Sequence, residues 1–106
     1  MIIVTTNDLP GYRITQVKGL ARGITVRSRS IVGNLGGAIQ SIFGGNISVY
    51  TNLAEQARQE ALGLLTSDAQ KMGANAIIAM RYDANEIMDG ITEVLAYGTA
   101  VVVEKV

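Results

Sequence analysis

Two segments in the last third of the chain are apolar on both of their alternating faces. They are residues 74–83, "ANAIIAMRYD", and residues 92–106, "TEVLAYGTAVVVEKV". Their β-branched content favours strands. An antiparallel sheet with one face in water shows a polar residue at every second position. Because these segments lack that alternation, both faces of the sheet that they form must be covered.

One long helix is predicted between residues 52 and 73, and it can cover one face. Asn52 and Glu55 have the spacing of a capping box, Lys71 suits the last turn, and Gly73 suits a C-terminal cap. The predicted apolar stripe comprises Leu53, Ala54, Ala57, Ala61, Leu64, Leu65 and Met72. Three of these seven residues are alanine, so we expect a close approach to its neighbour. The second face needs something else.

The remaining segments complete an α+β chain. Residues 1–6, "MIIVTT", predict a short edge strand that ends in the turn residues "NDLPG". Residues 12–30 predict a strand in which Gly19 and Gly23 indicate a bulge, a bend or a hairpin turn. Residues 84–91, "ANEIMDGI", predict a polar connection of eight residues in an antiparallel hairpin. We therefore expect one domain over residues 1–106, with a strand, helix, strand, strand core.

Five glycines in residues 33–45 precede the long helix and raise the question of a phosphate-binding loop. Neither Gly-Lys-Ser/Thr nor Gly-x-Gly-x-x-Gly occurs there. The apolar residues of this region instead have the spacing of a short helix: Ile31, Leu35, Ile39, Ile42 and Phe43. We interpret the glycines as sites of close packing or subunit contact rather than of anion binding.

The composition excludes several functions. The chain has 106 residues, 48% of them hydrophobic and 17% charged, and nine basic residues balance nine acidic ones. This balance gives no field that would attract nucleic acid or a membrane. The N-terminus lacks a signal peptide pattern, so we expect a cytoplasmic protein. Cysteine and histidine are both absent, which removes thiol nucleophiles, the commonest general base and the usual soft-metal ligands.

Candidate binding residues cluster around the predicted hairpin connection. They are Arg81, Asp83, Glu86, Asp89 and Glu93. One interpretation is a site for a hard cation, or an anion site organised by Arg81. The other is an ion pair of Arg81 with Asp83 or Glu93 beside a solvated loop. No catalytic residue, metal ligand or cofactor is assigned, and the chain is not expected to be an enzyme.

Four motifs in order resemble the YbjQ-like family: "LPGY", "IFGG", "GANAIIAMRYD" and "EVLAYGTAV". The resemblance covers residues 5–103. It implies a β-α-β-β core similar to the dodecin subunit and assembly into a ring-shaped homopentamer. Members are often labelled heavy-metal-binding, but this chain offers only the thioethers of Met1, Met72, Met80 and Met88 as soft ligands. Met72 and Met80 already fit the core.

Three hypotheses about function follow. The chain is a homo-oligomeric binding or structural module for an unknown small ligand or ion, a metal or metalloid carrier, or an enzyme. The residues favour the first. About half of the large side chains on the last two strands face away from the long helix, and a neighbouring subunit is predicted to cover them.

Overall fold

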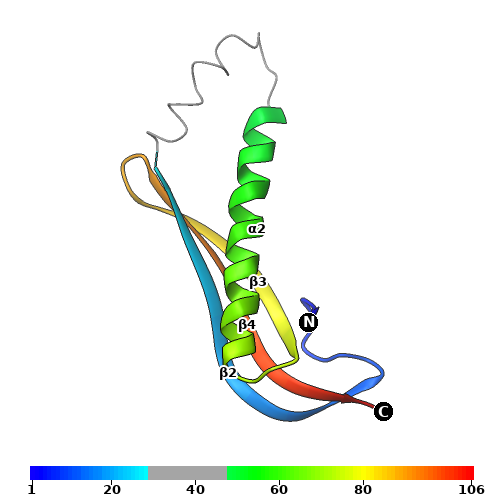
Figure 1. The fold of residues 1–106 in the computed structure, drawn as a ribbon. Coiled ribbons are helices and arrows are strands. Elements are labelled where there is room, and N and C mark those ends of the chain that lie inside the picture. Colours follow the sequence, from blue (N-terminus) through cyan, green and yellow to red (C-terminus); the bar gives the residue numbers. More distant parts are fainter. Residues whose placement is uncertain (29–47) are drawn as a thin grey trace.

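The structure is a computed structural model that describes residues 1–28 and 48–106. In the described part, the helix α2 (Ser48–Lys71) packs on a mixed sheet of four strands (Figure 1). The strands are β1 (Ile2–Ile3), β2 (Tyr12–Ser28), β3 (Ala76–Met88) and β4 (Ile91–Lys105). Their order across the sheet is β1-β3-β4-β2, and only the β1–β3 pair is parallel. The predicted α+β class is confirmed, and the short helix predicted over residues 31–43 lies outside the described residues.

The long helix begins earlier than the sequence predicted. It starts at Ser48, so Asn52 lies inside the helix and the expected cap at Asn52 with Glu55 is wrong. Residues 48–51, which precede Asn52 in the helix, include β-branched ones. Such residues cost only a few tenths of a kcal/mol each in a helix and do not stop it. The predicted end is confirmed, because Gly73 has a φ of 84° and its N–H donates to the Gln70 carbonyl over 3.0 Å.

The contact between helix and sheet consists largely of alanine. Ala57, Ala61, Leu65 and Ala69 form the buried stripe of α2, at intervals of four residues. They pack on Ala21, Val94, Ala96 and Ala100, which face them from β2 and β4. The close approach is therefore confirmed. Ala54 and Leu64 are exposed in this chain, however, so the buried stripe is narrower than predicted.

The two glycines of β2 have different roles, and neither forms a hairpin turn. Gly19 follows a register shift between β2 and β4 and has a φ of 125°, which identifies a bulge. Gly23 lies directly beneath the helix. A Cβ atom there would be 2.3 Å from both the Ala61 carbonyl oxygen and the Leu65 nitrogen. Glycine at this position allows α2 to rest on β2.

The hairpin between β3 and β4 is longer than predicted. Residues 84–88 continue β3, and only Asp89 and Gly90 connect the strands, since Met88 pairs with Ile91. The expected eight-residue connection is wrong because polar residues in an exposed hairpin can pair in a sheet as well as form a loop.

Strand β3 has an irregularity at Ala79, where φ is 52°. It moves Met80 to the helix side, where it packs with Ile77.

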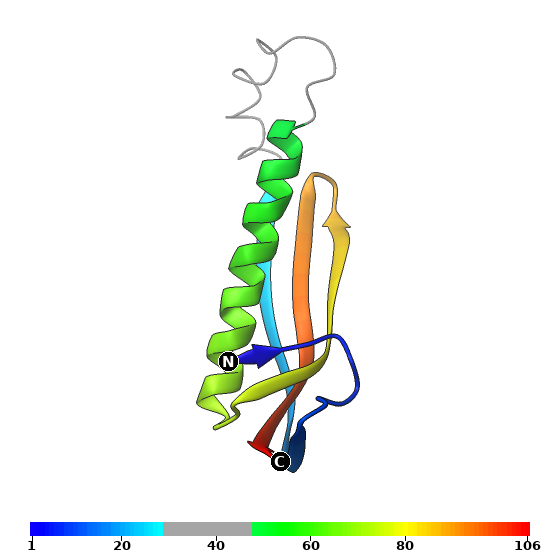
Figure 2. The same cartoon turned by 90° about the vertical axis from the view of Figure 1, so that its right-hand side faces the viewer.

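The face of the sheet opposite the helix is partly covered by the chain itself. Ala76, Ile78, Val101 and Val103 form a second buried cluster there. Four residues of the N-terminal region pack against it: Ile2, Val4, Leu9 and Tyr12. This region lies at the end of the sheet that also carries the C-terminus (Figure 2). We expected another subunit to cover this whole face. That expectation is wrong for the end that carries the C-terminus, because the N-terminal region of the same chain covers it.

Candidate functional site

Towards the β3–β4 hairpin, the face of the sheet opposite α2 has no cover from the described chain. Paired residues of neighbouring strands point to the same side. Arg22 pairs with Tyr97, and Tyr97 with Arg81; Ile24, Leu95 and Asp83 form the next row, and Val26, Glu93 and Asn85 the one after. These nine residues are called the open face below. Helix α2 lies on the opposite side.

Strand β2 adds an apolar stripe along the length of this side. It comprises Ile14, Val17, Leu20, Ile24 and Val26, which are 36, 68, 63, 44 and 49% exposed. Their spacing is irregular in sequence, but β2 has register shifts after Ile14 and after Val17. Each shift adds one residue, so side chains three positions apart stay on one face. We call these five residues the β2 stripe.

The predicted polar cluster is divided between the two sides of the sheet. Arg81, Asp83 and Glu93 belong to the open face. Glu86 pairs with Thr92 on the helix side, and its Oε1 accepts a hydrogen bond of 3.1 Å from the Gly90 N–H. Asp89 forms part of the turn. The structure thus brings together three of the residues and separates Glu86 from them.

Arg81 fastens the N-terminal segment to the sheet. Its guanidinium donates hydrogen bonds of 2.8 Å to the Thr5 and Met80 carbonyls. The expected ion pair with Asp83 or Glu93 is absent among the described residues. Asp83 instead accepts a hydrogen bond of 3.1 Å from the Asn85 side chain. Arg81 therefore has a structural partner, and the open face is mixed: Ile24, Leu95 and Val26 are apolar, whereas all three of its β3 residues are polar.

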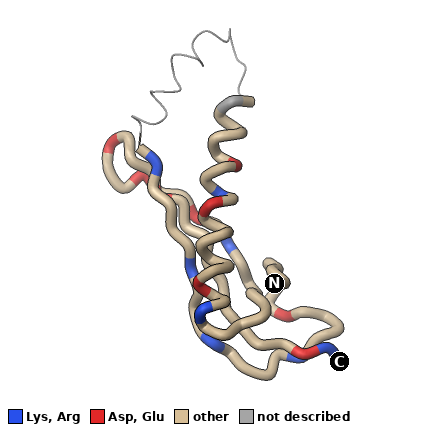
Figure 3. The backbone as a smooth tube through the Cα atoms, in the orientation of Figure 1, with Lys and Arg blue, Asp and Glu red and all other residues tan. Residues whose placement is uncertain are grey.

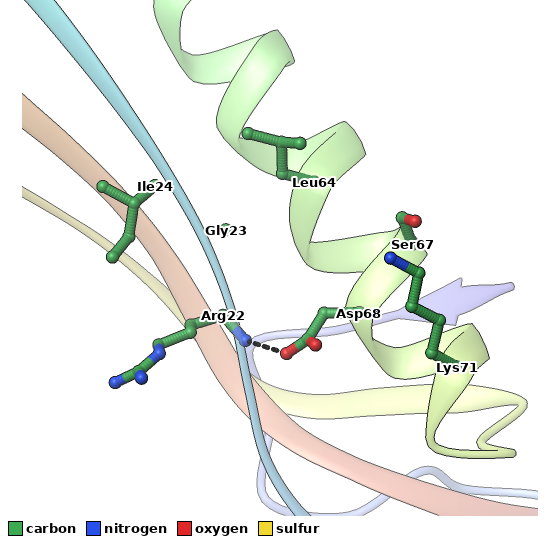
Figure 4. A pocket seen from close by; sticks show the side chains of 7 residues that line it. All are labelled: Arg22, Gly23, Ile24, Leu64, Ser67, Asp68 and Lys71. Carbon is green, nitrogen blue, oxygen red and sulfur yellow. Dashed lines mark hydrogen bonds between the residues drawn. The ribbon is translucent and has the colours of Figure 1, made fainter.

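A hollow of about 340 Å³ lies beside β2, between that strand and the last turns of α2 (Figure 4). Asp68 reaches from the helix and accepts a hydrogen bond of 3.0 Å from the Arg22 backbone N–H. The side chains of Arg22 and Ile24 point away from the helix (Figure 4). The carboxylate in this hollow therefore accepts a hydrogen bond from a backbone N–H of the edge strand. This contact gives the hollow a structural role.

A second, more apolar groove lies between α2 and the hairpin, with a volume of about 240 Å³. Leu53, Ala54 and Ala57 line it from the helix, and Ala84 and Val94 line it from the strands. Arg27, Arg58 and Thr92 complete the lining. Sequence reasoning missed this groove because residue 84 was assigned to a loop. The "ANEIMDG" stretch could have revealed it, since Asp-Gly between apolar residues also signals a tight hairpin.

The ligands available to a soft metal do not come together. Met80 is buried and Met72 packs against the same core, whereas Met88 is exposed at the hairpin tip. Within residues 1–28 and 48–106, no group of three or more Asp or Glu side chains could hold an ion either. With no cysteine or histidine in the sequence, the side chains present do not fit a thiophilic metal.

In the described part of the chain, these features define a small α+β protein with helix α2 on a mixed sheet and the apolar β2 stripe on the other side. The chain belongs to the YbjQ family, whose profile, described as "Putative heavy-metal-binding", matches residues 1–104. A UPF0145 protein of Burkholderia thailandensis is 62% identical over 100 residues, which are 94% of this chain and 90% of that one. A UPF0145 protein of Burkholderia mallei is 61% identical with the same coverage.

A solved structure shares the fold. It is a crystal structure of a protein of unknown function from Pediococcus pentosaceus, assigned to the DUF74 family. The TM-score is 0.64 at 19% identity, and the alignment covers 98% of each chain. None of these names describes an enzymatic activity. Among the described residues, no helix has the length and hydropathy needed to cross a bilayer.

Proposed function

We propose that this chain is the subunit of a closed homo-oligomer that serves as a binding or structural module, without enzymatic activity. The observation that carries the proposal is the β2 stripe. Five large apolar side chains on one edge strand are exposed in the single chain. An exposed apolar surface of this extent on a small domain is typical of an interaction site.

The free energy involved is large for a domain of this size. Full burial of one such side chain contributes about 1.5–3 kcal/mol, so completing the burial of five half-exposed ones contributes on the order of 5 kcal/mol. That value approaches the whole stability of a small domain, about 5–15 kcal/mol. A second copy presenting an apolar surface supplies this burial. The expected number of five subunits derives from the family resemblance, whereas the exposed stripe supports only self-association.

Sedimentation at low micromolar concentration tests the proposal. We expect a discrete oligomer for the unchanged chain and dissociation for Leu20→Glu, which places a charge in the β2 stripe. Gln16→Glu is the matched control, because Gln16 is exposed and pairs with Val102, outside the stripe. A folded 11.2 kDa monomer would refute self-assembly. An intact oligomer in Leu20→Glu would show that the stripe is not the interface.

A further inference from the structure

Among the described residues, helix α2 leaves the β3 side of its own face uncovered. The helix lies over β2 and β4 and has little contact with β3. As a result, Tyr82 and Ala84, which pair with the helix-side residues Ala96 and Val94, are exposed. The apolar groove lies in this uncovered strip. The small residues Ala54, Ala57 and Ala84 line it, and their side chains are too short to fill the space between helix and strand.

The groove combines an apolar floor with basic residues. Arg27 forms an ion pair with Glu60, but Arg58 makes no ion pair among the described residues. The chemistry that fits is an apolar side chain accompanied by a carboxylate. A purely polar segment would not match the apolar floor, and a basic segment would not match the basic residues.

The hairpin tip of the same chain has this composition. Ile87 is 54% exposed and Met88 is 62% exposed, although both are large and apolar. Glu86 precedes them directly, and acidic residues stand at the tip in Figure 3. The tip ends in a connection of only two residues. It is therefore a narrow apolar and acidic projection.

We propose that the hairpin tip, residues 86–88, of one copy occupies the apolar groove of the next copy. The tip cannot enter its own groove, because Ala84 in the groove wall and Met88 at the tip belong to one extended strand and lie roughly 13 Å apart along it. Tip and groove are different surfaces, so the contact is heterologous and generates a ring when its rotation closes. The inference rests on the proposed self-association and adds to the contact proposed at the β2 stripe a second one, between tip and groove.

Disulfide trapping tests this contact, because the chain has no cysteine of its own. The double variant Ala54→Cys/Ile87→Cys places one thiol in the groove and one at the tip. After oxidation at low micromolar concentration, we expect a ladder of covalent multimers on a non-reducing denaturing gel. Each single variant is expected to remain monomeric there, since like positions do not meet in a heterologous contact. Double variants that assemble in sedimentation but give no ladder would overturn this inference and leave the proposed function standing.

A charge exchange provides the second test. Arg58→Glu and Glu86→Arg are each expected to raise the dissociation constant by about tenfold, because each replaces attraction with repulsion at the contact. The double variant restores opposite charges and should recover most of the affinity. Gln59→Glu is the control for added charge on the exposed surface of α2. If the double variant dissociates as readily as Arg58→Glu alone, Glu86 and Arg58 are not partners and the proposed contact is wrong.

Discussion

Gly23→Ala is expected to be among the most damaging single changes in the chain, although it adds only one methyl group. The new Cβ would lie 2.3 Å from the Ala61 oxygen and the Leu65 nitrogen, and 2.8 Å from the Leu64 carbonyl carbon. These are backbone atoms of α2, which no rotamer change can move. The helix would have to retreat by about 1 Å to reach an ordinary contact distance. This retreat loosens the packing of Ala57, Ala61, Leu65 and Ala69 all along the buried stripe.

The expected cost is about 3 kcal/mol, the upper end of the usual range for overpacking. For a domain of this size, that loss lowers Tm by roughly 12–24 °C. Thermal unfolding followed by circular dichroism at one fixed protein concentration measures it. Gly63→Ala is the matched control, because a Cβ at that helical position meets nothing within 4 Å. The control should gain about 0.5–1 kcal/mol from helix propensity. A Gly23→Ala protein that melts within two or so degrees of the unchanged chain, about 0.5 kcal/mol or less, would refute this account of the helix contact.

Two further predictions concern metal and Arg81. Calorimetric titration with Cd²⁺ or Hg²⁺ should show only weak carboxylate binding, because the chain has no cysteine or histidine; stoichiometric sub-micromolar binding would contradict this. Arg81→Met should cost about 0.5–1.5 kcal/mol through loss of the exposed hydrogen bond to the Thr5 carbonyl, measured by denaturant unfolding. Its effect should add to that of Asp83→Leu within about 0.5 kcal/mol, and clear coupling in this double-mutant cycle would restore the ion-pair interpretation.

The elements of the fold could be predicted where local pattern and tertiary packing agree. The helix stop at Gly73 follows from the conformational freedom of glycine, and β4 follows from its β-branched run. The helix start at Ser48 could not be predicted from the capping signature at Asn52, because that signature also fits the interior of a helix. The end of β3 was predicted too early in the sequence for a similar reason. Exposed polar residues carry no burial pattern, so sequence alone does not distinguish a paired strand from a loop.

The surfaces were harder to predict than the elements. The β2 stripe depends on two register shifts, and the helix-side position of Met80 depends on the irregularity at Ala79. A period of two cannot show which residues share a face once an extra residue has been inserted. The candidate cluster around Arg81 was only partly recovered because residues 84–91 were expected to form a loop, whereas residues 84–88 continue β3. Glu86 lies near Arg81 in the sequence, but it belongs to the other side of the sheet.

The distribution of covered and open surfaces favours assembly through faces rather than through strand edges. Strand β2 is an edge strand, and an exposed edge invites pairing with another chain. Asp68 satisfies the Arg22 N–H from the helix, so a strand added at this point would have to displace that carboxylate. The adjoining β2 stripe stays apolar and open on the face opposite the helix. A neighbour can bury that stripe without breaking the hydrogen bond to Asp68, whereas a strand paired along β2 cannot. Assembly by face packing therefore retains the protection of the edge and buries the exposed side chains.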